Sequence, residues 1–158
     1  MEKLIATVKR VVVQSPDIKT IYFLLEDGWK LEYEAGQYIT VYKPDSSVTQ
    51  GKAYSLSSAP HEKWMSITVK EIGEYSRYLC ELRAGDTFLI SRAYGHFKPA
   101  IGKPIIALAA GVGIAPIISI IKDKSHQGSN QTVDLYYSNK LSDGIAHRDQ
   151  LQTSDVTV

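Results

Sequence analysis

The hydrophobic periodicity of this chain changes near residue 100, and that change restricts the folds open to it. Before residue 100 the apolar residues recur with a period of two, and turn sequences such as Ser15-Pro16-Asp17 and Ala84-Gly85-Asp86 separate the runs. Because a period of two lets one face of each strand enter a core, six such runs predict an all-β, antiparallel Greek-key barrel. The six predicted strands span residues 5–13, 18–25, 37–42, 53–57, 65–70 and 87–91.

One short helix is predicted between the fifth and sixth strands. Tyr75, Leu79 and Leu82 follow an i, i+4, i+7 pattern, which places them on one helical face. We expect this helix to close one end of the barrel.

After Gly102-Lys103-Pro104 the pattern becomes that of an α/β lobe. Residues 105–110 form an unbroken apolar run, which is typical of a strand buried on both faces of a parallel sheet. A glycine turn, an apolar helix over residues 115–121, a polar loop over 123–131 and a second apolar strand over 133–137 follow. This order predicts one βαβ unit, with a domain boundary near residues 97–104.

Composition excludes several classes of function. Eighteen basic and seventeen acidic residues give a formal net charge of +1, so neither nucleic acid nor a membrane surface is an expected partner. Cys80 is the only cysteine, which excludes an internal disulfide and a cluster held by cysteines of this chain. The four histidines have no metal-ligand spacing, and no apolar signal core follows Met1. We therefore expect no metal site and a cytoplasmic protein.

A strand with a ring and two hydroxyls is the first motif. In Lys52-Ala53-Tyr54-Ser55-Leu56-Ser57, Tyr54 offers a flat ring for stacking, and Ser55 and Ser57 offer hydroxyls at alternate positions. Lys52 adds a positive charge where a phosphate could sit. The alternative is an ordinary barrel strand whose tyrosine covers the core.

The second motif is a glycine before a helix. Gly73 precedes Tyr75 and Ser76 at the predicted helix start, where amide hydrogens and the helix dipole attract an anion. The alternative is that Gly73 only permits a positive backbone dihedral and Ser76 only caps the helix.

The third motif is a glycine turn between the apolar strand and the apolar helix. Gly111 and Gly113 would let a pyrophosphate approach the backbone, and Pro116 suits a first helical turn. The alternative is a tight βα turn in which glycine serves packing alone.

Taken in this order, the three motifs resemble those of the ferredoxin-NADP reductase superfamily, and especially the reductase portions of flavohaemoproteins and small soluble flavin reductases. That family carries an Arg-x-Tyr-Ser strand, a Gly-x-x-Ser helix start and a Gly-x-Gly-x-x-Pro turn. Lys52 here replaces the arginine, and Val112 replaces a threonine of the commonest turn. The resemblance implies an FAD-binding barrel over residues 1–100 and an incomplete, Rossmann-like lobe for NADH or NADPH over residues 101–158.

The resemblance also implies roles for individual residues. Tyr54 would pack on the isoalloxazine ring and Ser55 would bond near its N5 edge, so these two are the candidate catalytic residues. The implied cofactor-binding residues are Lys52, Tyr54, Ser55, Leu56, Ser57, Thr68, Lys70, Gly73, Tyr75, Ser76, Gly111, Val112, Gly113, Ile114 and Pro116. Lys140 lies where a basic residue could contact a ribose phosphate, but it could also be an ordinary loop lysine. The sequence therefore gives no choice between NADH and NADPH.

The expected function is therefore an FAD-dependent oxidoreductase that passes electrons from NADH or NADPH to an acceptor that the sequence does not identify. Residues 101–158 are fewer than the roughly 100–150 residues of a usual nucleotide-binding domain. A truncated chain, a naturally short protein and a half-domain completed by a second copy or a partner chain all remain open. The alternatives to an enzyme are a non-catalytic flavin-binding or regulatory module and, less favoured, a nicotinamide-binding motif beside a filled barrel.

Overall fold

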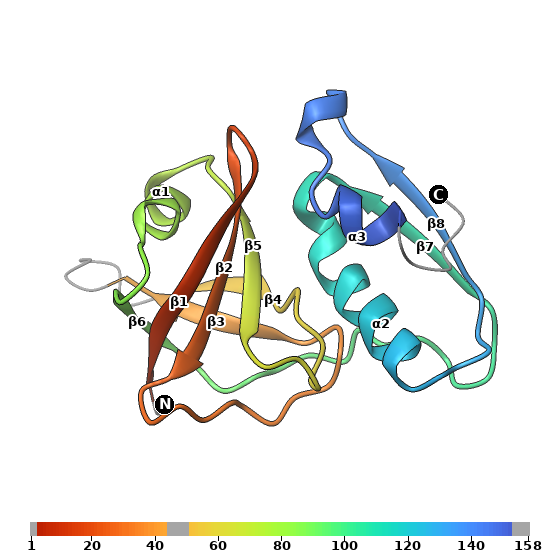
Figure 1. Cartoon of the computed structure of the whole chain (residues 1–158), viewed down its shortest axis with the longest axis horizontal. Coiled ribbons are helices and arrows are strands. Elements are labelled where there is room, and N and C mark those ends of the chain that lie inside the picture. Colours follow the sequence, from red (N-terminus) through yellow and green to blue (C-terminus); the bar gives the residue numbers. More distant parts are fainter. Residues whose placement is uncertain (1–2, 44–50, 153–158) are drawn as a thin grey trace.

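The computed structural model describes residues 3–43 and 51–152, which form a barrel and an α/β lobe side by side (Figure 1). The barrel is a six-stranded antiparallel sheet in the order β4-β3-β6-β1-β2-β5. A bridge between Leu56 and Ile67 joins the two end strands and closes the barrel. Its strands are β1 Leu4–Ser15, β2 Ile18–Leu25, β3 Tyr38–Tyr42, β4 Lys52–Ser55, β5 Met65–Lys70 and β6 Thr87–Ile90. The predicted six-stranded barrel is confirmed, with boundaries that shift by up to two residues.

Apolar side chains from alternate strand positions fill the barrel. Phe23 and Phe88 meet edge to face with ring centroids 5.1 Å apart, and both are buried. The predicted helix forms as α1 Glu74–Glu81, and its Leu79 joins this core. Cys80 is buried beside it, and burial raises the pKa of its thiol, as suits a packing residue rather than a reactive one.

The second lobe contains the predicted βαβ unit. Strand β7 Ile105–Ala110 pairs in parallel with β8 Val133–Ser138, and α2 Ile114–His126 connects them after a single 3₁₀ turn, Gly111–Gly113. The helix is longer than predicted, because its polar last turns continue through residues expected to be loop. A second short turn, Ser142–Gly144, and α3 Arg148–Gln152 follow β8.

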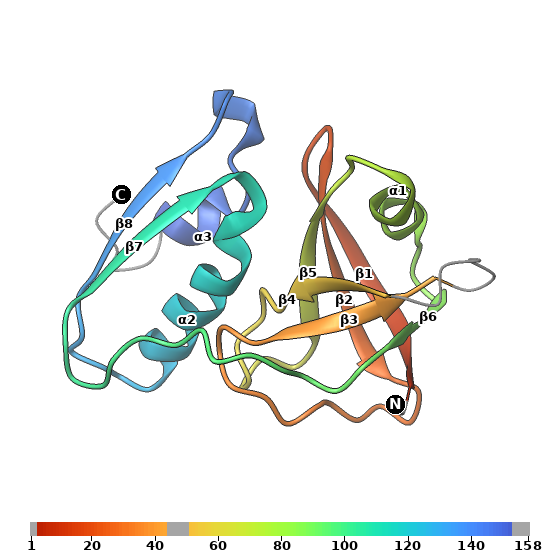
Figure 2. The ribbon, with the colours of Figure 1, turned by 180° about the vertical axis from the view of Figure 1, so that it is seen from behind.

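The expectation that β7 is buried on both faces is wrong. Ala107 is 8% exposed, but its neighbours Ile106 and Leu108 are 71% and 74% exposed. Helices α2 and α3 lie on the same side of the two-stranded sheet, so the described residues cover one face only (Figures 1 and 2). The apolar run therefore indicated a parallel strand correctly, while burial of its second face requires a further layer.

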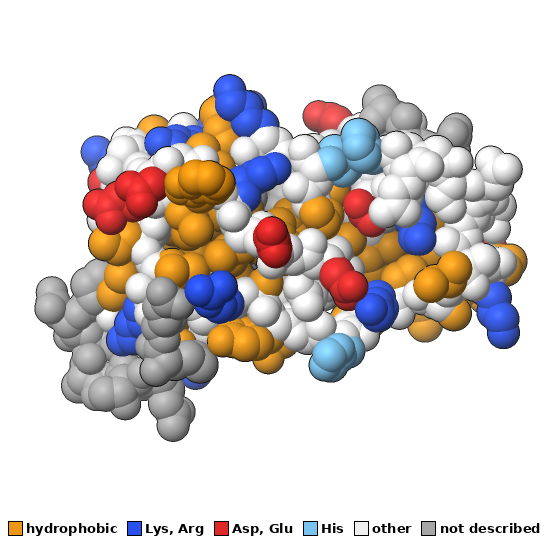
Figure 3. All heavy atoms as spheres, turned by 90° about the horizontal axis from the view of Figure 1, so that it is seen from below, with side chains coloured by type: hydrophobic (Ala, Val, Ile, Leu, Met, Phe, Trp, Pro, Cys, Tyr) orange, Lys and Arg blue, Asp and Glu red, His pale blue; other side chains and the backbone are white. Residues whose placement is uncertain are grey.

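Two further observations concern the charges on the surface and the search for membrane-spanning helices and metal sites. On the face drawn in Figure 3, described basic and acidic side chains are interspersed between apolar ones, in keeping with the small net charge. Among the described residues, no helix is long and apolar enough to cross a membrane, and no cluster of His, Cys, Asp or Glu has the geometry of a metal site.

Candidate functional site

A cavity of about 820 Å³ lies where the two lobes meet. The barrel contributes β4, the end of β5 and the start of α1, and the second lobe contributes the turn before α2. The three sequence motifs, far apart in the chain, thus reach one cavity. The predicted site residues that line it are Lys52, Tyr54, Ser55, Thr68, Lys70, Gly73, Tyr75, Ser76, Val112, Gly113 and Pro116.

Aromatic and apolar groups form part of the cavity wall. Tyr54 is half-buried and packs against the barrel core, as the alternative interpretation expects, and it also lines the cavity, where its stacking on a ligand ring stays a prediction. Burial raises the pKa of its hydroxyl, which keeps the ring neutral. Tyr75 lies on the same cavity, and Ile72, which the motifs did not indicate, lines it with 84% of its surface exposed.

The charged groups of the cavity are partly paired. The Lys70 ammonium lies 3.1 Å from the Asp17 carboxylate and, as the largest of several causes, lowers the pKa of that carboxyl. Glu74 forms an ion pair with Lys43, which lowers the pKa of Glu74. No described carboxylate lies within ion-pair distance of Lys52, so its charge is the one of these least neutralised by described neighbours.

The start of α1 is capped by its own residue Ser76. The Ser76 hydroxyl accepts the amides of Ile72 at 2.9 Å and Gly73 at 3.0 Å, and it donates to the Gly73 carbonyl at 2.9 Å. The capping interpretation of Ser76 therefore describes its geometry. The companion interpretation of Gly73 is wrong, because its φ of −170° is extended backbone that any residue adopts.

The glycine turn before α2 has one glycine with a positive φ and one with an ordinary φ. Gly111 has a φ of +51°, which favours glycine, and its carbonyl accepts a hydrogen bond of 2.9 Å from the Tyr137 hydroxyl of β8. Gly113 has an ordinary φ of −61° and directly precedes α2. Pro116 lies in the first turn of that helix, as predicted.

Four of the predicted site residues lie elsewhere. Leu56 is fully buried in the barrel core, and the Ser57 hydroxyl bonds to that of Ser66 at 2.9 Å. Ile114 is fully buried under the β7–β8 sheet, because it begins the apolar face of α2. Gly111 lines an adjoining cavity of about 740 Å³ that Lys140 also borders.

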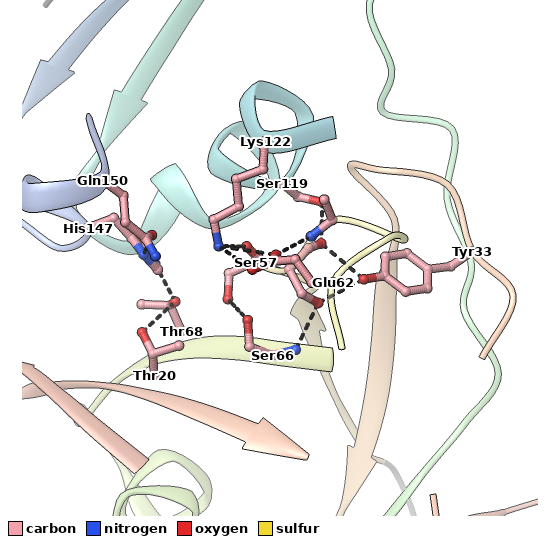
Figure 4. Close-up of polar contacts among 12 residues, drawn as sticks. Thr20, Tyr33, Ser57, Glu62, Ser66, Thr68, Ser119, Lys122, His147 and Gln150 are labelled. Carbon is pink, nitrogen blue, oxygen red and sulfur yellow. Dashed lines mark hydrogen bonds and ion pairs between the residues drawn. The ribbon is translucent and has the colours of Figure 1, made fainter. Parts of the chain in front are cut away.

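Sequence reasoning also missed a ring of hydrogen bonds across the lobe contact, of which Figure 4 shows the part from Thr20 through Thr68 to His147 and Gln150. The His147 amide donates to Gln14 Oε1 at 2.9 Å, which leaves Gln14 Nε2 to donate to the Thr20 hydroxyl at 3.1 Å. Gln150 Oε1 can only accept, so His147 Nδ1 donates to it at 2.8 Å. In the neutral imidazole Nε2 then accepts from the Thr68 hydroxyl at 2.7 Å, and Thr68 in turn accepts from Thr20 at 3.1 Å.

Burial favours a neutral imidazole in this ring. His147 is 2% exposed, and burial is the largest cause that lowers its pKa to about 4. Thr68, although it borders the cavity, is 5% exposed and has its hydroxyl engaged in the ring. The members come from distant parts of the chain, so no sequence motif could have indicated them.

Comparisons with known proteins identify the family and the fold. The family model described as "Oxidoreductase FAD-binding domain" matches residues 5–98. The flavohemoprotein of Bacillus subtilis is 34% identical over 145 residues, which cover 88% of this chain and 36% of the relative. The ferredoxin reductase component of 3-ketosteroid-9-alpha-monooxygenase from Rhodococcus rhodochrous is 31% identical over 156 residues, which cover 94% of this chain and 44% of the relative.

Solved structures give the same fold over both lobes. Ferredoxin-NADP+ reductase from Plasmodium falciparum matches with a TM-score of 0.85 at 19% identity, over 96% of this chain and 64% of that one. The flavohem-like FAD/NAD binding domain of nitric oxide dioxygenase from Vibrio cholerae matches with a TM-score of 0.84 at 24% identity, over 94% of this chain and 68% of that one. The chain spans about a third to three fifths of the length of the curated relatives that it matches. It belongs to the oxidoreductase FAD-binding domain family, with the fold of the ferredoxin-NADP reductases and part of their nucleotide-binding lobe.

Proposed function

We propose that this chain binds FAD in the 820 Å³ cavity and acts as an oxidoreductase that takes a hydride from NADH or NADPH and passes the electrons to an acceptor. Two glycines in the cavity wall carry the proposal. A Cβ built on Gly73 or on Gly113 would meet no atom within 4 Å, and neither residue has a positive φ. Neither backbone strain nor packing requires glycine at these N-cap positions, and the absence of a side chain leaves room there for a ligand.

The residues around these glycines suit a dinucleotide that carries a flavin. Tyr54 offers a ring for stacking, and Lys52 offers a charge for a phosphate at the open edge of β4. Gly73 allows a phosphate to approach the positive end of the α1 dipole. Leu56, Ser57 and Ile114 are left out of this proposal as ligand contacts, because they are buried in packing.

The chain's own contribution to the chemistry is orientation. Bound FAD supplies the redox step, since it can accept a hydride and release electrons singly or in pairs. Ser55 would donate a hydrogen bond at the reactive edge of the ring. The turn Gly111–Gly113, held through its Gly111 carbonyl by Tyr137, would bind the pyrophosphate of the nicotinamide cofactor on the other side of the cavity.

We propose a protein as the electron acceptor, because relatives are described as reductase components of oxygenases. The alternative, a flavin-binding module without catalysis, is favoured by one observation. The outer face of the β7–β8 sheet exposes Ile106, Leu108 and Tyr136, so the nucleotide lobe lacks a covering layer in the described residues.

Anaerobic rapid mixing of the FAD-loaded chain with NADH and, separately, NADPH distinguishes the two. The oxidoreductase proposal expects the flavin absorbance to bleach at a rate that rises with the concentration of at least one nucleotide. We expect this reduction to be slow and hard to saturate, because the partly covered lobe offers few groups to hold the nicotinamide. Flavin that binds and is never bleached by either nucleotide leaves the non-catalytic module as the function.

A further inference from the structure

We propose that Ser119 and Lys122 of α2 are positioning residues. They hold the glycine turn Gly111–Gly113, which precedes α2, at a fixed place relative to the flavin-facing strand β4. They do so by binding the segment Ser57–Glu62, here called the docking loop. The catalytic consequence rests on the proposed function, whereas the mechanical role of the two residues does not.

Two residues of α2 contact the docking loop, one through a short buried bond and one through longer, partly buried bonds (Figure 4). The Ser119 hydroxyl donates to the Ser58 carbonyl at 2.6 Å, and both residues are fully buried. The Lys122 ammonium donates to the Ser57 carbonyl at 3.2 Å and lies 3.3 Å from the Glu62 carboxylate. Ser119 and Lys122 are three residues apart, so they lie on one face of the helix.

A third contact extends this face toward the end of the helix. The imidazole of His61, in the docking loop, stacks on that of His126, with ring centroids 3.7 Å apart and an angle of 11° between the rings. Contacts along α2 from Ser119 to His126 restrain both its position and its direction, which a single contact would not do.

The docking loop is itself fixed to the barrel. The Ser58 hydroxyl accepts the Ser66 amide of β5 at 2.8 Å and bonds to the Tyr33 hydroxyl at 2.8 Å. The Glu62 carboxylate accepts the Ala59 amide at 2.7 Å, which closes the loop on itself. A displacement of the loop relative to the barrel would break several of these bonds, so α2 is held against a rigid support.

On both sides of this contact, the contacting residues lie only a few positions along the chain from segments that line the cavity. Ser57 follows Ser55, the last residue of β4, by two positions. Ser119 follows Ile114, the first residue of α2, by five positions, which is about 7.5 Å along a helix. Hydride transfer is sensitive to misplacement of the reacting atoms by about 1 Å. If α2 were freed from the docking loop, the alignment of the nicotinamide with the flavin would therefore be lost before the binding of FAD to the barrel.

The kinetic test compares Ser119→Ala/Lys122→Met with the parent chain, both loaded with FAD. We expect the affinity for FAD to change less than about threefold and the rate of flavin reduction, compared at one fixed nucleotide concentration, to fall about 10–100-fold. Lys122→Arg, which keeps the charge, should recover part of the rate. Lys124→Met is the matched control, because the Lys124 ammonium makes no ion pair with a described residue.

The structural test measures the separation of the lobes directly. Spin labels at the exposed positions Lys9→Cys and Asp134→Cys, in a Cys80→Ala background, report one distance across the lobe contact. We expect a single narrow distribution in the labelled parent and a broadened or shifted one when Ser119→Ala and Lys122→Met are added, with and without FAD.

The outcomes separate the two proposals. Identical distance distributions overturn the proposed role of Ser119 and Lys122. A broadened distribution with an unchanged reduction rate overturns their positioning role in catalysis. If the parent binds no FAD, the proposed function fails, and the label distances alone then decide whether these residues hold the lobes together.

Discussion

Acidification should weaken the native state through His147. In the folded chain Thr68 donates to Nε2 of a neutral imidazole, so a proton on Nε2 would place a charge where almost no water reaches and would reverse the hydrogen bonds of the ring that joins the lobes. Burial is the largest cause that lowers the pKa, the hydrogen bond to Gln150 opposes it, and nearby Lys122 and Glu62 act in opposite directions.

The size of the effect follows from the two pKa values. His147 has a pKa of about 4 in the folded chain against 6.5 for an ordinary histidine. Between these values the unfolded chain binds a proton that the folded chain does not, so stability rises with pH. The contribution is complete above about pH 6.5 and is lost as the pH falls toward 4, and at 1.36 kcal/mol per pH unit it amounts to about 3 kcal/mol.

Urea unfolding of the wild-type chain and of His147→Asn at pH 7.5 and pH 4.5 measures this contribution. Asparagine tolerates the left-handed backbone of position 147, where φ is 60°, and does not titrate. The lowered pKa of Asp17 keeps its ion pair with Lys70 at pH 4.5, and the protonation of other carboxylates is the same in both chains, so its effect cancels. We expect the wild type to lose about 2–3 kcal/mol more than the variant between the two pH values. Equal losses would refute the buried, neutral state of His147.

Three further predictions concern the cavity. Gly73→Ala should change the free energy of unfolding by less than about 1 kcal/mol and weaken FAD binding at least about tenfold, because its Cβ meets no protein atom but would enter the cavity. Denaturant and FAD titrations measure these two changes, and equal losses of free energy in unfolding and in binding would refute the prediction. Lys52→Ala should weaken FAD binding more in low salt than in high salt, since salt screens an exposed charge over about 8–10 Å; affinity losses independent of salt would contradict a phosphate contact. Ser55→Ala should slow flavin reduction in stopped-flow more than it weakens affinity, and the reverse order would remove its role at the reactive edge.

The local pattern predicted the barrel well. Alternate strand positions face the inside of the barrel, and the period of two that Ile21 and Phe23 share reflects this, although the outward-facing Tyr22 between them is buried by other contacts. The glycine turn was also predictable, because φ at Gly111 and the proline in the following helical turn are local backbone requirements. Burial of the outer face of β7 was not predictable, because it depends on whether a further layer is present.

Predictions for individual site residues were less complete, because the burial of a residue depends on contacts between distant parts of the chain. Leu56 and Ser57 continue the motif in sequence, but the chain leaves β4 there to close the barrel, which buries both residues. The lobe contact combines Thr20, Thr68 and His147, whose proximity depends on the packing of two lobes. Residue type and spacing alone contain no information on such contacts.

Titration of the purified chain with FAD tests the central claim most directly, with Tyr54→Ala as the comparison. We expect equimolar binding at micromolar protein, with quenched flavin fluorescence, and an affinity about 10–100-fold lower in Tyr54→Ala because the stacking ring is lost. FAD that stays fully fluorescent with the parent chain and separates from it completely on gel filtration would contradict a flavin site between the two lobes.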